Sequence, residues 1–178
     1  FKEVPKDDIH IVAYLTLGKY CADYDNLVLG LAEKSVLKAL SRACGVSEKR
    51  IKELAHEKGD AGLVAQEVMK KKPQTLIPVG KLTIHEFFDA LHKIAKIEGS
   101  GSQEKKSNVL TNVLSKCTPL DAKYIIRIVL GTLRLGVAEM AVLDALAIAY
   151  TGEKKNKEQL EAAYNLCPDV GVIAETIA

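Results

Sequence analysis

One stretch of this chain occurs twice, and the repetition limits what the chain can fold into. Residues 29–41 read LGLAEKSVLKALS and residues 135–147 read LGVAEMAVLDALA, with eight of thirteen positions identical at an offset of 106. Each stretch follows an apolar run ending in Leu-Gly (17–18 and 130–131) and precedes a D-x-G motif (60–62 and 169–171). Two repeats are too few for a solenoid. We therefore expect two similar helical units related by an approximate two-fold axis.

The remaining pattern is helical throughout. The 178 residues include no Trp and three Phe, so the core must be aliphatic, and apolar residues recur with a period near 3.6 without sustained alternation. We predict an all-α fold, a single helical domain over 1–178 with a first half of about 1–72, a connection of about 73–82 and a second half of about 83–178. The expected helices are 7–20, 33–44, 47–57, 60–72, 84–97, 103–116, 119–130, 138–150, 157–166 and 169–177.

Several helix starts carry a recognisable cap. Thr83 with Glu86 forms a capping box, and Thr118 precedes Pro119 at a first helical position. Ser47 and Ser102 are further N-cap candidates because their hydroxyls can accept hydrogen bonds from first-turn amides.

Net charge, cysteine spacing and the length of apolar runs bear on three functions: nucleic-acid binding, metal binding and membrane insertion. The formal net charge of +2 does not by itself indicate a nucleic-acid binder. The four cysteines lie far apart without zinc-ligand spacing, which favours reduced thiols and predicts no metal site. No apolar run has the length that a membrane span needs, so no membrane partner is expected.

The strongest candidate for a binding function is GTLRLGVAE at 131–139. We expect one helix to end at Gly131 and another to begin near Val137. Gly136 would let a ligand approach the backbone, and first-turn amides would point at the loop. An anion gains there from the amides and the helix dipole, and Arg134 can add a charged contact. Leu29-Gly30 forms a similar corner. The alternative is an ordinary interhelical turn, and repetition alone does not decide between them.

A second candidate is EGSGSQEKK at 98–106, where glycines and serines precede a helix. Backbone amides, Ser hydroxyls and the nearby Lys105 and Lys106 would form a phosphate seat. Catalytic motifs are missing by contrast. There is no G-x-x-x-x-G-K-[ST] loop, no Lys-x-Asp-Gly, no nucleophile elbow and no carboxylate pair, so we expect no catalytic residue.

These residues resemble a known family. The run KYIIRIVLGTLRLGVAEMAVLDALA (123–147) is similar to a signature of the N-terminal DNA-binding domain of ATP-dependent DNA ligases, and EGSGSQEKK resembles its G-x-GS-x-x-K loop. LGLAEKSVLKAL and GDAGLVAQEVMKKK resemble its first half. The resemblance covers essentially the whole chain and is strongest to archaeal members. Relative to the family, a first helical segment is missing before Phe1.

The resemblance implies non-sequence-specific binding of nicked double-stranded DNA through the minor groove, in replication, repair and recombination. Nick sealing with ATP and Mg²⁺ is expected from separate catalytic and OB-fold domains, which would also be partners; this chain alone would be inactive and bind no cofactor. A cytoplasmic, nucleoid-associated location is implied, or a nuclear one in a eukaryote. The implied DNA-binding residues are Leu29, Gly30, Gly99, Ser100, Gly101, Ser102, Gln103, Lys105, Lys106, Gly131, Thr132, Leu133, Arg134, Leu135 and Gly136. Thr132 and Met140 stand where the family often has a charged or polar residue, and Lys34 or Lys123 would compensate for a basic group missing at position 132.

Two further hypotheses stay open. Archaeal ligases carry a short Gln-containing sliding-clamp motif on the connection, which places a weak clamp contact at Gln74 and Ile77; a proline-rich linker is the alternative. The competing function is a helical protein–protein interaction scaffold, which the near-neutral charge and abundant apolar helices favour.

Overall fold

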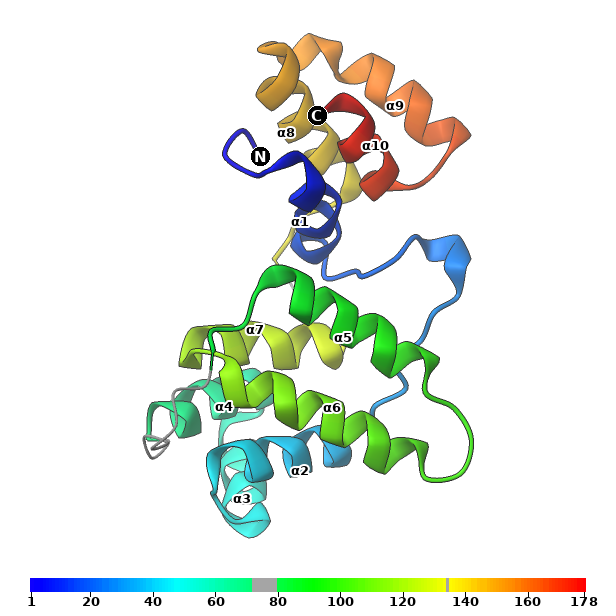
Figure 1. Ribbon diagram of the computed structural model, residues 1–178. Helices are drawn as coiled ribbons and strands as arrows, with labels where there is room; N and C mark the ends of the chain where they lie inside the picture. The colour runs from blue at the N-terminus through cyan, green and yellow to red at the C-terminus, as the bar shows by residue number, and fades with distance from the viewer. Residues whose placement is uncertain (72–79, 134) are drawn as a thin grey trace. The chain divides into compact units, whose positions relative to one another are not determined.

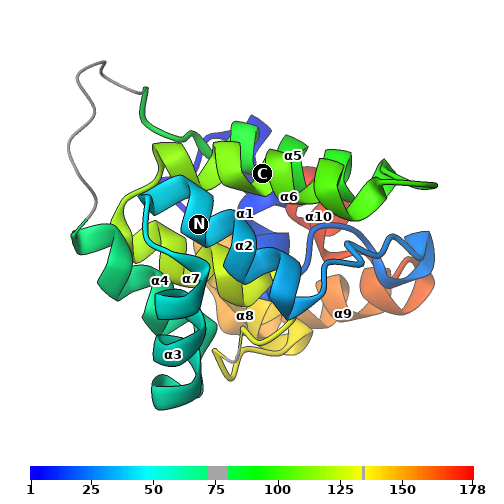
Figure 2. The same ribbon diagram turned by 90° about the horizontal axis from the view of Figure 1, so that it is seen from below.

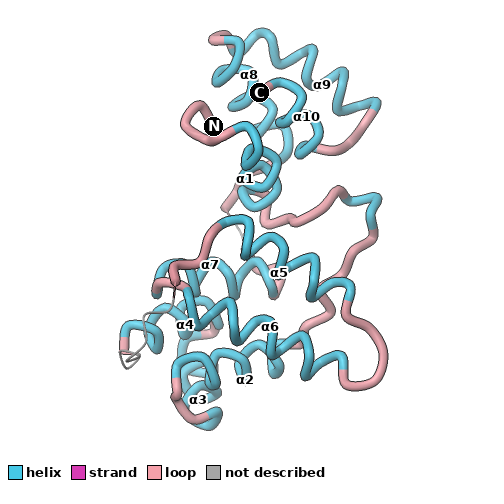
Figure 3. Tube along the Cα trace, viewed as in Figure 1, coloured by secondary structure: helices cyan, strands magenta, loops and turns pink. Residues whose placement is uncertain are grey.

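The computed structural model describes residues 1–71, 80–133 and 135–178, and within those ranges every regular element is helical (Figures 1 and 3). The predicted all-α class is therefore confirmed. The α-helices are α1 (Ile9–Thr16), α2 (Glu33–Cys44), α3 (Glu48–Lys58), α4 (Ala61–Lys70), α5 (Ile84–Lys96), α6 (Ser102–Lys116), α7 (Pro119–Val129), α8 (Glu139–Thr151), α9 (Lys157–Leu166) and α10 (Val170–Ile177). The described ranges also contain the short 3₁₀ helices η1 (Lys6–Asp8), η2 (Asp23–Asp25) and η3 (Lys154–Asn156).

Most of the predicted helix starts are confirmed. Ser47 accepts from the Arg50 amide, and both Thr83 and Thr118 form complete capping boxes. Ser102 is different: Gly101 is the N-cap of α6 and Ser102 is its first helical residue, without a side-chain cap. The reason is the turn at 99–102, in which the Ser102 amide already donates to the Gly99 carbonyl at 3.2 Å.

The chain forms two compact units, each with its own core. Unit 1 combines Phe1–Leu27 with Arg134–Ala178 and contains α1, α8, α9 and α10. Unit 2 is Val28–Leu133 and contains α2 to α7. The aliphatic core that composition predicts is present in both: fully buried side chains include Ile9, Ile11, Leu143 and Leu146 in unit 1, and Leu40, Ile51, Leu91, Ile94, Leu110, Leu114 and Ile126 in unit 2.

Each unit contains helices that come from both sequence repeats. The offsets of 106 to 113 pair α1, α2, α3 and α4 of the first repeat with α7, α8, α9 and α10 of the second. In unit 2, α7 packs along α4, and in unit 1, α1 packs against α10 (Figures 1 and 2). Each unit thus holds three helices of one repeat and the first helix of the other. The connection expected at about 73–82 between the two sequence halves falls inside unit 2. The two-fold relation between the halves stays a prediction.

Matched aspartates hold the exchanged helices in place. Asp60 caps α4 by accepting from the Leu63 amide at 2.9 Å, and it also accepts from the Arg127 guanidinium of α7 at 2.6 Å. Asp169 caps α10 and accepts from the Tyr14 hydroxyl of α1 at 2.5 Å. Arg127 and Tyr14 occupy equivalent positions of the two repeats, at the offset of 113. The D-x-G motif is therefore a docking point for the first helix of the other repeat.

Both aspartates titrate below their ordinary range. The hydrogen bond from Arg127 is the main cause that lowers the pKa of Asp60. At Asp169 burial acts in the opposite direction, but hydrogen bonds from Tyr14, the Val172 amide and Tyr24 hold the pKa low. Both carboxylates are therefore ionised acceptors at neutral pH.

The glycine of each D-x-G motif lets the exchanged helix come close. A Cβ on Gly62 would stand 2.7 Å from the Lys123 carbonyl oxygen, and a Cβ on Gly171 would overlap the Tyr14 ring. Because backbone atoms of α7 cannot rotate away, the Gly62 position admits no side chain without separating α4 from α7.

We predict that Gly62→Ala destabilises the chain by about 1–3 kcal/mol, because overpacking at this contact outweighs the better helix propensity of Ala. Urea unfolding followed by circular dichroism measures the change. Gly80→Ala is the matched control, since a Cβ there meets nothing within 4 Å. Equal midpoints for the two variants would contradict the assigned role of Gly62.

Candidate nucleic-acid interface

Three α-helices of the described chain begin after a loop without a side-chain cap. Their N-cap residues are Ala32 for α2, Gly101 for α6 and Ala138 for α8. The other helices that follow a loop, α3, α4, α5, α7 and α10, all have a capping side chain. First-turn amides that lack a capping acceptor stay available to an external one, and the helix dipole favours an anion there. The three uncapped starts are those at the predicted binding loops.

The two LGxAE corners have the same backbone conformation. Gly30 and Gly136 both adopt a left-handed conformation, with φ of +58° and +68°. Ala32 and Ala138 are extended, and the helices begin one residue later at Glu33 and Glu139. The predicted new helix near Val137 is thus confirmed. The glycines are required because a left-handed φ strains other residues.

In unit 2 the first corner is joined to the Gly-Ser loop. The Lys106 ammonium donates to the Leu29 carbonyl at 2.6 Å, and the Gln103 amide donates to the Gly30 carbonyl at 2.7 Å. The Ser35 hydroxyl in turn donates to the Gln103 side-chain oxygen at 3.1 Å. Two predicted binding segments that are about 70 residues apart in sequence therefore lie together, at the neighbouring starts of α2 and α6.

Lys106 differs from the sequence expectation. The resemblance presents it as a phosphate contact, but its side chain is 7% exposed and its ammonium is bound to Leu29. The physical reason is helical spacing: Lys106 lies one turn before Leu110 and two before Leu114, on the buried face of α6. Lys106 therefore fastens the corner, whereas Lys105, one position earlier, is exposed.

An ion-pair cluster closes the rest of the α2–α6 contact. Glu104 accepts from Lys38 at 2.9 Å and from Arg42 at 2.6 Å. The hydrogen bond from Lys38, followed by that from Arg42, lowers the pKa of Glu104. Glu104 thus neutralises one of the two positive charges of α2 at this partly exposed contact, and Lys34 and Lys105, both exposed, add further positive charge at the corner.

Among the described residues, the part of the second corner that lies in unit 1 has exposed apolar side chains around it, and Lys19 lies beside Glu139. Leu135, Val137 and Met140 are 51%, 38% and 41% exposed. The Lys19 ammonium lies 2.7 Å from Glu139 and 2.8 Å from Asp23. Sequence reasoning missed Lys19. The repeat contained the signal, because Lys19 follows Leu17-Gly18 as Thr132 follows Leu130-Gly131.

The remaining predicted residues are placed as follows. Gly99, Ser100, Gly101, Gln103, Gly131 and Thr132 are exposed, and Ser102 and Leu133 are half-buried. The boundary between the units falls within the second corner, with Leu133 in unit 2 and Leu135 in unit 1. Arg134, Gln74 and Ile77 lie outside the described residues.

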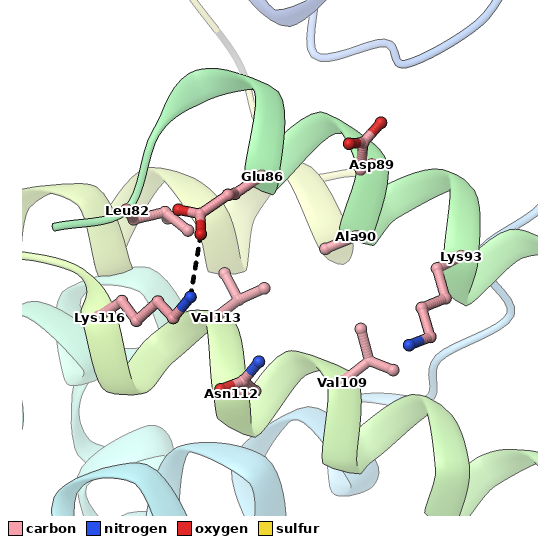
Figure 4. A pocket seen from close by; sticks show the side chains of 9 residues that line it. All are labelled: Leu82, Glu86, Asp89, Ala90, Lys93, Val109, Asn112, Val113 and Lys116. Carbon is pink, nitrogen blue, oxygen red and sulfur yellow. Dashed lines mark hydrogen bonds and ion pairs between the residues drawn. The ribbon is translucent and has the colours of Figure 1, made fainter. Parts of the chain in front are cut away.

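A groove of about 260 Å³ between α5 and α6 is separate from these corners (Figure 4). Its floor is apolar, with Val109 and Val113 on α6, and the Glu86–Lys116 ion pair of 3.0 Å crosses one end. None of the predicted binding residues lines it. In the described ranges, no group of three or more His, Cys, Asp or Glu is arranged to hold a metal ion, and no helix is long and apolar enough to cross a membrane.

Comparison with known proteins identifies the family. The family model described as DNA ligase N terminus matches residues 1–147. The chain belongs to this family. It is 41% identical over 178 residues to a DNA ligase of Nitrosopumilus maritimus, 42% over 185 residues to DNA ligase 2 of Thermofilum pendens, and 38% over 178 residues to a probable DNA ligase of Aquifex aeolicus. All of this chain is covered in each case, against 30%, 31% and 30% of the relative. The chain thus spans about a third of their length.

We predict that Lys106→Met destabilises this ligase-family chain by about 1–3 kcal/mol, because the buried Leu29 carbonyl loses its donor. Hydrogen exchange at Gly30 to Glu33 should accelerate in the same variant as the corner loosens. Lys105→Met is the matched control, with the same side-chain change one position away on the exposed face. If both variants unfold at the same urea concentration, the ammonium of Lys106 does not hold the corner.

Proposed function

We propose that this chain is the DNA-gripping N-terminal part of an ATP-dependent DNA ligase. It would bind double-stranded DNA on both sides of a nick, through the minor groove and without sequence specificity. Domains outside residues 1–178 would supply the nucleotidyl transfer, with ATP and Mg²⁺, in replication, repair and recombination. Family membership and the ligase names of the relatives support this proposal.

The observation that carries the proposal is the pair of matched, uncapped corners. A capped helix start has already used its first-turn amides on a side chain of the protein. No N-cap side chain does so at α2 or α8, although the Glu139 carboxylate accepts from its own amide, and each start follows a left-handed glycine. Each corner suits one phosphate-sized anion, and a duplex offers a phosphate row on each strand.

The side chains around the corners suit the backbone of DNA more than its bases. At the first corner Lys34 and Lys105 add positive charge beside open amides. At the second, Leu135, Val137 and Met140 offer apolar surface to the sugars that line the minor groove. Contacts to phosphate and sugar fix position without reading sequence. The chain would therefore bind nicked duplexes of different sequence with similar affinity.

The test uses two lysines at equivalent helix positions. Lys34 is the second residue of the uncapped α2, and Lys49 is the second residue of the capped α3; each follows a glutamate, and both are exposed. We predict that Lys34→Gln lowers the affinity for nicked duplex DNA by about tenfold, the loss of one charge-assisted contact. The slope of log K against log salt should become shallower by about 0.9. Fluorescence anisotropy in a salt series measures both.

Lys49→Gln should leave affinity and slope unchanged. An equal loss in both variants would mean that binding follows overall charge and not the open helix start. Binding of the unaltered chain that ignores salt would instead favour the helical scaffold. A sliding-clamp contact at Gln74 and Ile77 stays a separate hypothesis, since both residues lie outside the described ranges.

A further inference from the structure

The start of α8 carries an ion pair that cannot form between the equivalent residues at the start of α2. The Lys19 ammonium lies 2.7 Å from the Glu139 carboxylate and 2.8 Å from the Asp23 carboxylate. Lys19 follows α1, and Glu139 is the first residue of α8, so the pair joins the two repeats within unit 1. At the offsets of 113 and 106, the equivalent residues of unit 2 are Thr132 and Glu33. Thr132 has no charge and therefore cannot form the same ion pair.

The Glu139 carboxylate occupies donors of the kind that a phosphate uses. The hydrogen bond from Lys19, followed by that from its own backbone amide, lowers the pKa of Glu139. An ammonium and a first-turn amide are also the donors with which a helix start binds a phosphate. A carboxylate and a phosphate both present anionic oxygens to such donors. The second corner thus already contains an internal anion.

This ion pair is accessible and weak enough to be exchanged. The side chains of Lys19 and Glu139 are 28% and 31% exposed. An ion pair at a protein surface changes an equilibrium constant by about two- to fivefold at most. A charge-assisted contact to an anion contributes about tenfold or more. A phosphate that takes over the Lys19 ammonium therefore gains more than the separation of the pair costs.

We propose that Glu139 competes with DNA for Lys19: its carboxylate holds the ammonium in the free protein, and a phosphate of the bound duplex takes its place. The inference rests on the proposed function, which brings a phosphate to the start of α8. Lys19 then contacts DNA in addition to the predicted loops, and Glu139 limits the affinity. The competition also makes the two corners unequal, because Thr132 offers no ammonium at the first.

Single variants of the two partners give opposite effects. Glu139→Gln removes the competing charge and keeps the size of the side chain, so the affinity of the chain for nicked duplex DNA should rise about two- to fivefold. Lys19→Gln should lower the affinity about tenfold, the loss of one charge-assisted contact. Fluorescence anisotropy at one salt concentration measures both, and urea unfolding checks that each variant folds. A lower affinity of a folded Glu139→Gln variant would overturn the proposal, since Glu139 would then support the bound corner.

The double variant decides whether the gain comes from Lys19. Because the competition needs both partners, Glu139→Gln should no longer raise the affinity once Lys19→Gln is present. A rise of the same size with and without Lys19 would show that only the overall charge matters, and it would overturn the proposal.

Glu161→Gln is the matched control in the same unit. The Glu161 carboxylate lies 3.1 Å from Lys157, and the two side chains are 31% and 34% exposed, close to the values for Glu139 and Lys19. Lys157 also has a second acidic partner, Asp144, as Lys19 has. The control removes the same charge outside the predicted DNA-binding loops, so it should raise the affinity less than Glu139→Gln does. An equal rise in the two variants would overturn the proposal.

The proposed function and this inference fail in different ways. If the unaltered chain does not bind nicked duplex DNA in a salt-dependent manner, the proposed function is rejected and the competition with it. If the unaltered chain binds, but Glu139→Gln has no effect that depends on Lys19, the competition alone is rejected.

Discussion

The arrangement of this chain depends on one interaction made twice: an N-cap aspartate that also binds the first helix of the other repeat. Asp60 accepts from Arg127, and Asp169 accepts from Tyr14. Beside each aspartate a glycine removes the side chain that would keep the helices apart. Because α7 and α1 are held in this way, each unit contains helices of both repeats.

The helices of this protein begin in two ways: some N-termini are capped by a side chain, and others leave their first-turn amides without a side-chain cap. Where a start is used for packing, as in α4 and α10, an aspartate satisfies its amides and a partner helix satisfies the aspartate. Where a start follows an LGxAE corner, no side chain caps it. The uncapped starts forgo about 1 kcal/mol each that a cap would contribute. The first corner is instead held by α6, because the side chains of Lys106 and Gln103 donate hydrogen bonds to its backbone carbonyls.

Duplication also left the two repeats free to diverge. In the first repeat, Leu54 of α3 is buried and the corner is bound by Lys106 and Gln103 of α6. The second repeat has the same helix order, but the residue that matches Leu54 is the exposed Ala163, and Leu135, Val137 and Met140 around its corner are exposed. Matched positions in one chain thus serve as internal controls for each other.

The sequence by itself determined the local structure: the helices, their all-α class, the caps at Ser47, Thr83 and Thr118, and the left-handed turns at Gly30 and Gly136. These depend on periodicity and on backbone preferences within a few residues. The spacing of residues within α6 also indicates that Lys106 is buried, since Leu110 and Leu114 lie on the same face of the helix. Only the tertiary structure decided that Lys106 binds Leu29, that Lys19 meets Glu139, and that each first helix packs with the other repeat. Those contacts join residues 67 to 155 positions apart, and no local pattern specifies which distant partner satisfies a buried polar group.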